Sequence, residues 1–202
     1  GIADKIEFKV LVDFLLKGRR AVLYPVVKGT HERGVPPGIQ RGTKEHASLR
    51  VRQVQDVRRA VDYLESRPDI DGERIAFSGF SWGGGMANLV LAVEPRFKAG
   101  IVQAGGLEAR ARPPRPEVDY LHYAPRVRVP VLMVHGRYDL AIPLESEARP
   151  MFDLLATPAA HKRLLVVESD HFLPRAELVR EVLRWLDTHL GPVAPTAAGG
   201  GP

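Results

Sequence analysis

The stretch Arg74-Ile-Ala-Phe-Ser-Gly-Phe-Ser81-Trp-Gly-Gly-Gly-Met86 decides the fold of this chain. It contains the pattern Gly-x-Ser-x-Gly, from Gly79 to Gly83, between a short strand-like run and an apolar run of helical character. A strand, a tight turn and a helix in this order lift a serine hydroxyl above the edge of a sheet and beside a helix N-terminus. The context therefore predicts that Ser81 is a nucleophile, in a turn that needs glycine two residues before it and two residues after it.

Apolar and amphipathic segments alternate on both sides of this motif. Strands are expected at residues 20–27, 74–77, 99–103, 129–135 and 163–168, and helices at residues 4–17, 48–67, 86–92, 145–155 and 176–189. The strands are continuous apolar runs, which indicates that both faces of the sheet are covered. The expected fold class is α/β, a doubly wound, mostly parallel sheet with helices on both of its faces.

The remaining segments are polar or rich in glycine and proline. Residues 28–46 are expected to form a long loop, and residues 104–128 a small cap or crossing segment. We assign residues 1–190 to one catalytic domain and residues 191–202 to a flexible tail.

Composition excludes several classes of protein. The chain has 202 residues, of which 45% are hydrophobic, and it has no cysteine, so disulfides and thiol nucleophiles are excluded. No run of about 18 apolar residues indicates a membrane span, and no signal peptide opens the chain, so a cytoplasmic location is expected. The net charge of +5 could indicate nucleic-acid binding, but the basic residues are scattered among acidic ones, so we expect neither nucleic-acid nor membrane partners.

Two further residues complete a catalytic set with Ser81. A serine hydroxyl needs a general base, and the base needs a carboxylate that fixes its tautomer. Sites in doubly wound sheets lie beyond the carboxyl ends of the strands, and Asp139 and His171 each follow a predicted strand. The order Ser81, Asp139, His171 is the one expected when a serine nucleophile lies on such a turn. We therefore predict that Asp139, His171 and Ser81 are the catalytic residues.

Each assignment has an alternative. Asp139 could simply cap the turn before Pro143, and Asp170 could be the acid, although adjacent side chains diverge and Asp170 is poorly placed to orient His171. His135 is expected to brace the turn that carries the acid. The other histidines are read as surface residues: His31, His46, His122, His161 and His189. No histidine pair has metal-ligand spacing with a carboxylate, so we expect no metal and no cofactor.

Trp82 follows the nucleophile, and its backbone N–H is therefore the expected first donor of an oxyanion hole. Its indole either lines the acyl pocket or packs in the core, and the sequence favours neither.

Together these motifs resemble the α/β-hydrolase superfamily. The segment from His135 through Gly136 to Asp139, followed by Pro143, is similar to the acid-bearing turn of dienelactone-hydrolase-like and prolyl-oligopeptidase-like serine esterases. Asp170-His171-Phe172 is similar to their histidine loop, and the resemblance covers most of residues 4–190.

The chain departs from that family pattern at its beginning. No early Gly-rich loop supplies the second oxyanion donor, and residues 20–27 resemble the fourth strand of the superfamily while residues 74–77 resemble the fifth. The third strand should lie between these two. We therefore expect an upstream peptide segment, outside this sequence, that completes the sheet and the oxyanion hole, with Gly1-Ile2-Ala3 as a remnant of the donor loop.

The resemblance implies a serine hydrolase, specifically a carboxylesterase, that acts on a small-molecule ester through an acyl-enzyme intermediate. Two alternatives stay open: a peptidase of the prolyl-oligopeptidase type, and a non-catalytic hydrolase-like module that binds a ligand or a partner. Neither the acyl group nor the alcohol group of the substrate follows from the sequence.

Overall fold

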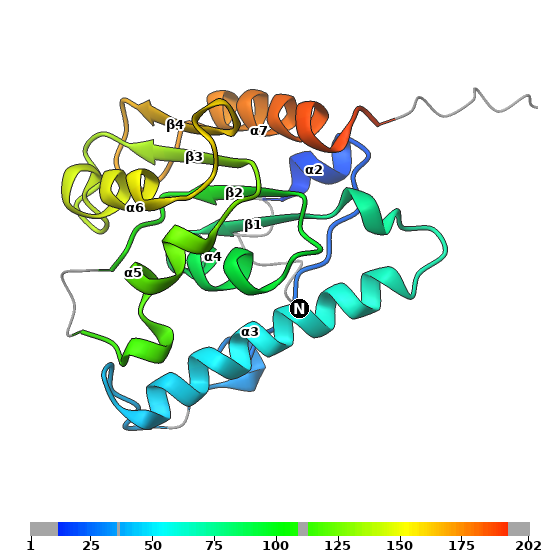
Figure 1. Cartoon of the computed structure of the whole chain (residues 1–202). Helices are drawn as coiled ribbons and strands as arrows, with labels where there is room; N and C mark the ends of the chain where they lie inside the picture. Colours follow the sequence, from blue (N-terminus) through cyan, green and yellow to red (C-terminus); the bar gives the residue numbers. More distant parts are fainter. Residues whose placement is uncertain (1–11, 36, 109–112, 194–202) are drawn as a thin grey trace, which may run out of the picture.

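The computed structural model describes residues 12–35, 37–108 and 113–193. Its sheet has four parallel strands in the order β1-β2-β3-β4 (Figure 1). The strands are β1 (Ala76–Phe80), β2 (Ala99–Gln103), β3 (Val131–Gly136) and β4 (Lys162–Val167). Every residue of β2 and β3 is buried, which confirms the expectation of a sheet covered on both faces.

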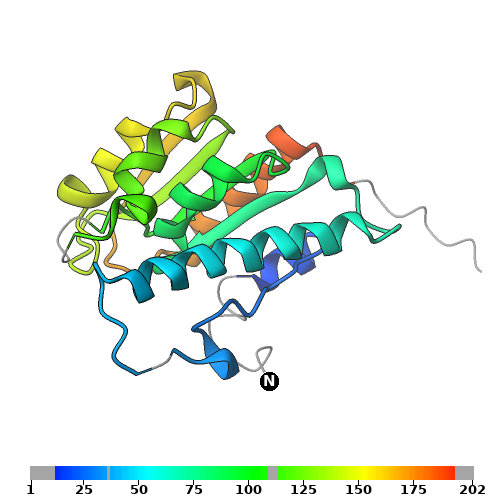
Figure 2. The same ribbon diagram turned by 60° about the horizontal axis from the view of Figure 1, so that its bottom comes forward.

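Six α-helices are described around the sheet: α2 (Asp13–Lys17), α3 (Lys44–Glu65), α4 (Trp82–Val93), α5 (Tyr120–Tyr123), α6 (Arg149–Leu154) and α7 (Arg175–Leu190). In Figure 1, α2 and α7 lie above the sheet, and α3, α4 and α5 lie below it. Figure 2 shows the long α3 running alongside β1 and α4.

The shorter helical segments lie in the connections between these elements. They are η2 (His31–Arg33), η3 (Gly72–Arg74), η4 (Pro116–Val118), η5 (Ala124–Arg126), the π-helical η6 (Leu144–Ala148) and η7 (Ala159–His161). The helix expected at residues 145–155 is therefore divided into η6 and α6.

The sheet has an apolar core on each of its two faces. Val131 and Met133 of β3 point to the face covered by α3 and α4, whereas Leu132 and Val134 point to the face covered by α2 and α7. This alternation follows from the two-residue repeat of a strand. The α/β fold predicted from the sequence, with helices on both faces of a parallel sheet, is confirmed.

The prediction of a strand at residues 20–27 is wrong. These residues form no strand and pair with none, and only Val27 among them is buried, while Leu23 and Tyr24 are exposed. A run of apolar residues becomes a strand only when a neighbour accepts and donates its ladder hydrogen bonds. Within the described residues, nothing pairs with the outer edge of β1 either, and β1 therefore lies at one border of the sheet.

His46 corrects a second expectation, because it is buried and not on the surface. The helix α3 begins at Lys44, four residues before the expected start, with the Thr43 hydroxyl accepting a hydrogen bond from the His46 N–H at 3.2 Å. His46 thus lies on the first turn of α3, and the inner face of this helix packs against the apolar core. Burial, together with the charges of Arg50 and Arg41, lowers the pKa of His46 to about 4, which keeps the ring neutral near pH 7.

The structure describes only part of the helix expected at the start of the chain and only part of the tail expected at its end. Most of the helix expected at residues 4–17 and the segment Gly1-Ile2-Ala3 lie outside the described residues, as does most of the expected tail. After α7, however, the carbonyl oxygens of Gly191 and Pro192 accept hydrogen bonds from the Arg74 guanidinium at 2.7 and 2.8 Å. Among the described helices, none combines the length and the apolar character that a membrane-spanning helix requires.

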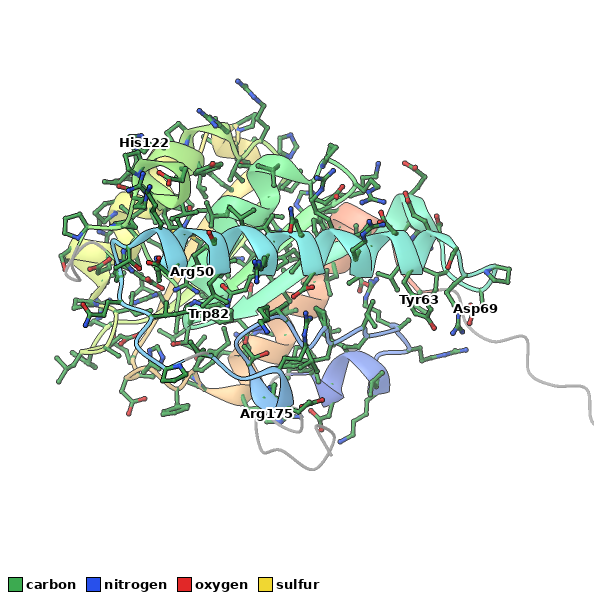
Figure 3. The ribbon with its side chains drawn as sticks, turned by 90° about the horizontal axis from the view of Figure 1, so that it is seen from below. Arg50, Tyr63, Asp69, Trp82, His122 and Arg175 are labelled. Carbon is green, nitrogen blue, oxygen red and sulfur yellow. The ribbon has the colours of Figure 1, made fainter. Side chains whose placement is uncertain are left out.

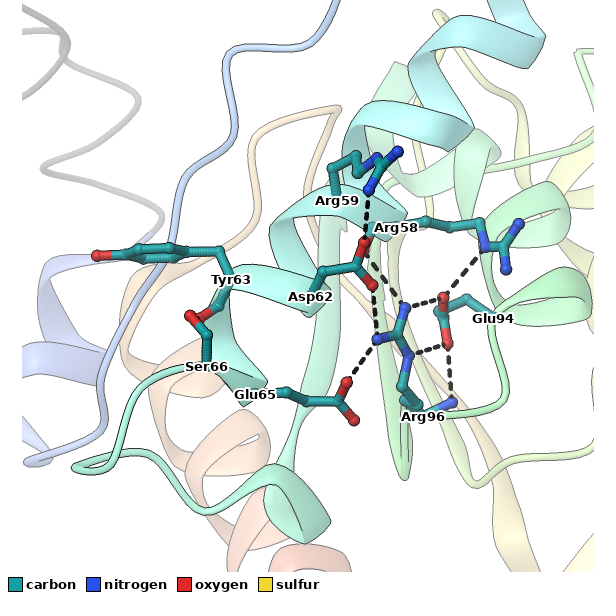
Figure 4. A network of polar contacts seen from close by, with 8 residues as sticks. All are labelled: Arg58, Arg59, Asp62, Tyr63, Glu65, Ser66, Glu94 and Arg96. Atoms are coloured by element: carbon teal, nitrogen blue, oxygen red, sulfur yellow. Dashed lines mark hydrogen bonds and ion pairs between the residues drawn. The ribbon is translucent and has the colours of Figure 1, made fainter.

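A buried carboxylate ties α3 to the end of α4 (Figure 4). Glu94 follows α4 and is 1% exposed. Its two oxygens accept from the Arg96 guanidinium at 2.7 Å each, and Oε2 also accepts from Arg58 of α3 at 3.3 Å. Arg96 in turn donates to Asp62 and Glu65 of α3. These contacts, led by the Arg96 hydrogen bonds, lower the pKa of Glu94 from 4.5 to about 2.

We expect Glu94→Gln to lower the free energy of unfolding at pH 7 by about 3 kcal/mol. The neutral amide lacks the negative charge with which the Glu94 carboxylate pairs with Arg96 and Arg58. The folded-state pKa lies below that of the unfolded chain. The stabilisation is therefore complete above pH 4.5 and is lost as the pH falls towards about 2. Urea unfolding of the wild type and the variant at several pH values measures both effects.

The matched control is Glu73→Gln, since Glu73 is exposed and pairs with Lys98 at the surface. Its effect should stay within about 0.5 kcal/mol. Equal unfolding midpoints for Glu94→Gln and Glu73→Gln would contradict the role given to Glu94.

Candidate active site

Ser81 lies between β1 and α4 in a strained turn. Its φ and ψ are 54° and −116°, a conformation that residues with a side chain rarely adopt. Its N–H donates to the Gln103 carbonyl at 2.8 Å, and its own carbonyl accepts from the Gly85 N–H at 3.0 Å. The backbone on both sides of the hydroxyl is thereby fixed, one hydrogen bond reaching β2 and the other starting the helix.

The two glycines of the motif have different roles. A Cβ at Gly79 would lie 2.2 Å from the Gly83 carbonyl oxygen, so the turn cannot close with any larger residue at position 79. A Cβ at Gly83 would meet nothing within 4 Å. The expectation that the turn needs glycine on both sides of Ser81 is therefore right for Gly79 and wrong for Gly83, because Gly83 contributes only its backbone to the close approach.

Asp139 lies in the turn that follows β3 and is buried. Its Oδ1 accepts from the Ile142 N–H at 2.8 Å. His135, fully buried on β3, has its Nε2 2.7 Å from the Ile142 carbonyl oxygen, so this nitrogen carries a proton and donates it. Burial lowers the pKa of His135, which is therefore neutral. His135 braces the turn, as the sequence predicted, and leaves the second oxygen of Asp139 to another donor.

His171 joins the two other predicted residues. Its Nδ1 lies 2.7 Å from Asp139 Oδ2, and its Nε2 lies 2.8 Å from Ser81 Oγ. A carboxylate can only accept, so the proton of a neutral imidazole is on Nδ1 and Nε2 accepts from the serine hydroxyl. The structure thus brings Ser81, His171 and Asp139 into one hydrogen-bonded line. The three residues come from the ends of β1, β4 and β3, which share one edge of the parallel sheet.

The loop that carries His171 packs directly on the end of β3. A Cβ at Gly136 would lie 1.9 Å from the Asp170 carbonyl oxygen and 2.6 Å from that of Ser169. The Tyr138 N–H also donates to the Ser169 carbonyl at 2.9 Å. Gly136 thus allows the two loops that hold the histidine and the carboxylate to touch. The glycine between His135 and Asp139 was the available signal in the sequence, but the pattern alone does not predict this contact between the two loops.

Asp170 is directed away from His171. Its Oδ1 accepts from the Phe172 N–H at 2.8 Å, and it makes no described contact with the imidazole of His171. This geometry favours Asp139 over Asp170 as the carboxylate partner of His171.

Trp82 is the first residue of α4, so its N–H is one of the helix-start donors without an acceptor inside the helix. The indole is half-buried against the core on the α3 side, and the Arg50 guanidinium stacks over it with 5.0 Å from Cζ to the ring centroid. Figure 3 shows Arg50 of α3 beside Trp82. The indole therefore packs against the core beneath Arg50 of α3.

Two aromatic residues beside the imidazole were missed by sequence reasoning. The ring of Phe80, which precedes Ser81, has its centroid 5.0 Å from that of His171, and Phe172 has its centroid 5.8 Å from it. Both are sequence neighbours of predicted catalytic residues, and that adjacency was the available signal. Across the ranges that the structure describes, no group of three or more His, Cys, Asp or Glu side chains could hold a metal ion.

Comparisons with known proteins agree with this architecture. The model of the dienelactone hydrolase family matches residues 10–163. Among curated proteins, the chain is 26% identical over 167 residues to the protein named "Uncharacterized peptidase YuxL" of Bacillus subtilis (strain 168). The match covers 67% of this chain and 25% of the relative, so the chain spans about a quarter of that relative's length.

Solved structures with the same fold include esterases and peptidases. A zinc-bound cold-adapted esterase from an Arctic intertidal metagenomic library superposes with a TM-score of 0.58 at 23% identity, over 74% of this chain and 66% of that one. Acetyl xylan esterase 1 from Thermoanaerobacterium sp. JW/SL YS485 gives 0.62 at 18% identity, over 80% and 64%. A putative dipeptidyl aminopeptidase IV from Bacteroides ovatus ATCC 8483 gives 0.65 at 18% identity, over 81% and 25%.

Proposed function

Because the chain belongs to the dienelactone hydrolase family, we propose that it is a serine hydrolase that cleaves carboxylic esters through Ser81, His171 and Asp139. The observation that carries this proposal is the continuous pair of hydrogen bonds, 2.8 and 2.7 Å long, from the Ser81 hydroxyl through the His171 imidazole to the Asp139 carboxylate. The strained turn at Ser81 supports it, since backbone strain of this kind persists where function requires a fixed geometry.

The first half of the proposed reaction acylates the enzyme. Ser81 Oγ attacks the ester carbonyl while its proton passes to His171 Nε2. Asp139 stabilises the imidazolium that forms, and the Trp82 N–H donates to the developing oxyanion. The tetrahedral intermediate then collapses, the bond to the alcohol oxygen breaks, and His171 returns its proton to that oxygen. The products are an acyl-serine and a free alcohol.

The second half releases the acid. A water molecule gives a proton to His171 Nε2 and attacks the acyl carbonyl. Collapse of the second tetrahedral intermediate breaks the bond to Ser81 Oγ, which takes the proton back. No cofactor takes part in either half.

Labelling with a fluorophosphonate probe tests the proposal directly. The probe forms a bond to an activated serine oxygen with loss of fluoride, so labelled peptide should map to Ser81 and the labelled protein should no longer hydrolyse nitrophenyl esters. Absence of labelling and of ester hydrolysis would instead support a non-catalytic binding module.

A peptidase is the second candidate, and the relative from Bacillus subtilis is named as one. Parallel assays on esters and on peptide amides with the same acyl group separate the two activities. For an esterase we expect ester turnover and no measurable cleavage of the peptide amide. Amide cleavage that is lost in Ser81→Ala would favour the peptidase.

We also propose that a further polypeptide segment pairs with the free edge of β1 and supplies the second oxyanion donor. Support comes from β1 itself, which carries the nucleophile yet has no neighbour on its outer side among the described residues. Its Ser78 is exposed although the adjacent β2 is wholly buried. Amide hydrogen exchange in β1 tests the pairing: exchange should be slower in a parent polypeptide that contains the segment than in the 202-residue chain, and equal rates would count against it.

A further inference from the structure

An exposed aromatic side chain stands beside the proposed general base. Phe172 is 72% exposed, a high value for a phenylalanine, and directly follows His171. Its ring centroid lies 5.8 Å from that of His171 and 6.0 Å from that of the half-buried Phe80. The three rings form one cluster, with the imidazole and Phe80 on the inner side and Phe172 towards solvent.

The backbone presents Phe172 in a fixed position. Its N–H is held by Asp170 Oδ1 at 2.8 Å, and the loop before it rests on Gly136 at the end of β3. The backbone of the histidine loop is thereby held at two points, and the exposed ring of Phe172 stands beside the imidazole as an apolar surface open to a ligand.

The chemistry of ester cleavage places one part of the substrate next to these rings. The alcohol oxygen must come within hydrogen-bond distance of His171 Nε2, because that atom returns the proton to the leaving group. The oxyanion instead accepts from its own proposed donor, the Trp82 N–H. The group attached to the alcohol oxygen thus extends past the imidazole, where Phe172 and Phe80 lie.

We propose that Phe172 and Phe80 form a subsite for the alcohol portion of the substrate, and that this subsite favours esters of aryl and other extended apolar alcohols. This inference rests on the proposed ester hydrolysis and adds the class of leaving group. The 6.0 Å between the two phenylalanine centroids is too short for a third ring, which would need roughly 7 Å for contact on both faces. The alcohol group therefore packs on the open side of Phe172.

Substitution of Phe172 tests the subsite. With the acyl group held constant, Phe172→Ala should lower kcat/KM for naphthyl acetate about tenfold and change that for trifluoroethyl acetate by less than about twofold. Phe172→Leu, which keeps apolar area, should lie between the two. The ratio of kcat/KM for naphthyl acetate and naphthyl butyrate should be the same in the wild type and Phe172→Ala, because the acyl group lies elsewhere.

Tyr63→Ala is the matched control. Tyr63 is also an exposed aromatic residue, but it lies 13 positions beyond Arg50 on α3, or about 20 Å along the helix from the residue that covers Trp82. Tyr63→Ala should leave both esters unaffected. An equal loss for both esters in Phe172→Ala would mean that the ring only steadies His171, and would overturn the subsite, as would no loss at all.

A binding measurement separates this inference from the hydrolase proposal. Naphthol, the alcohol product, should bind the wild-type protein and bind Phe172→Ala at least about fivefold more weakly, which fluorescence titration can measure. If no ester is cleaved but this difference is found, ester hydrolysis fails and the apolar subsite stands. If esters are cleaved and naphthol binds both proteins equally, the subsite fails and the hydrolase stands.

Discussion

Ser81→Ala is expected to lower kcat for ester hydrolysis by ~10⁴- to 10⁶-fold. The substitution removes the oxygen that forms the acyl-enzyme in the proposed mechanism. His171 keeps its 2.7 Å hydrogen bond to Asp139, but its Nε2 loses the hydroxyl that donates to it. Residual turnover should be close to that of water attacking a bound ester. Steady-state kinetics on nitrophenyl acetate measures the loss, and fluorophosphonate labelling should vanish in parallel.

The fold should survive this substitution. Alanine keeps the Cβ of serine, so the φ of 54° at position 81 is no more strained than before, and the hydrogen bond from the Ser81 N–H to Gln103 is a backbone contact. The matched control is Ser78→Ala on β1, the strand that leads into Ser81; the Ser78 hydroxyl accepts from the Gln103 side chain at 3.1 Å. It should retain turnover within about twofold. Near-normal activity of Ser81→Ala, in a protein free of contaminating esterase, would end the proposed mechanism.

Gly136→Ala is expected to lower kcat/KM at least about 100-fold without removing any catalytic group. The added Cβ would approach the Asp170 carbonyl oxygen to 1.9 Å, so the histidine loop or the end of β3 must move by more than 1 Å. Displacement of this size breaks the alignment of His171 with Ser81, and misplacement by 1 Å can cost that factor. The same overpacking should lower the free energy of unfolding by about 1–3 kcal/mol.

The control for Gly136→Ala is Gly72→Ala, where the added Cβ would meet only Glu65 Cγ at an ordinary 3.6 Å. This variant should keep both activity and stability. Thermal unfolding and ester kinetics, measured on both variants, separate a local displacement from general misfolding. Full activity in Gly136→Ala would show that the histidine loop is free to move and that the close contact does not position His171.

The parts of this molecule that the sequence predicted are those with local signals. Gly79 and Ser81 carry the signature of a tight turn within a few residues. Asp139 and His171 follow apolar runs, and parallel strands bring their carboxyl ends to one edge whatever their separation in sequence. For this reason the hydrogen-bonded line of the site could be predicted, although 90 residues separate Ser81 from His171.

The errors arose where structure depends on neighbours that a local pattern does not reveal. Residues 20–27 have the composition of a strand, but nothing in the described chain pairs with them. The apolar periodicity starts the helix at residue 48 and so predicts His46 in a loop, whereas the Thr43 cap starts the helix at Lys44. Gly136 and Phe172 act through contacts across loops, and these depend on the packing of β3 against the histidine loop.

The backbone conformation of Ser81 has a consequence for how the protein loses activity on heating. A left-handed φ outside glycine is unfavourable by about 1–3 kcal/mol, and the surrounding contacts must supply that free energy continuously. When those contacts loosen, the turn can relax before the sheet melts. Loss of activity on heating should therefore precede cooperative unfolding. The temperature at which activity is lost should depend on the hydrogen bonds that hold the Ser81 backbone to β2 and α4.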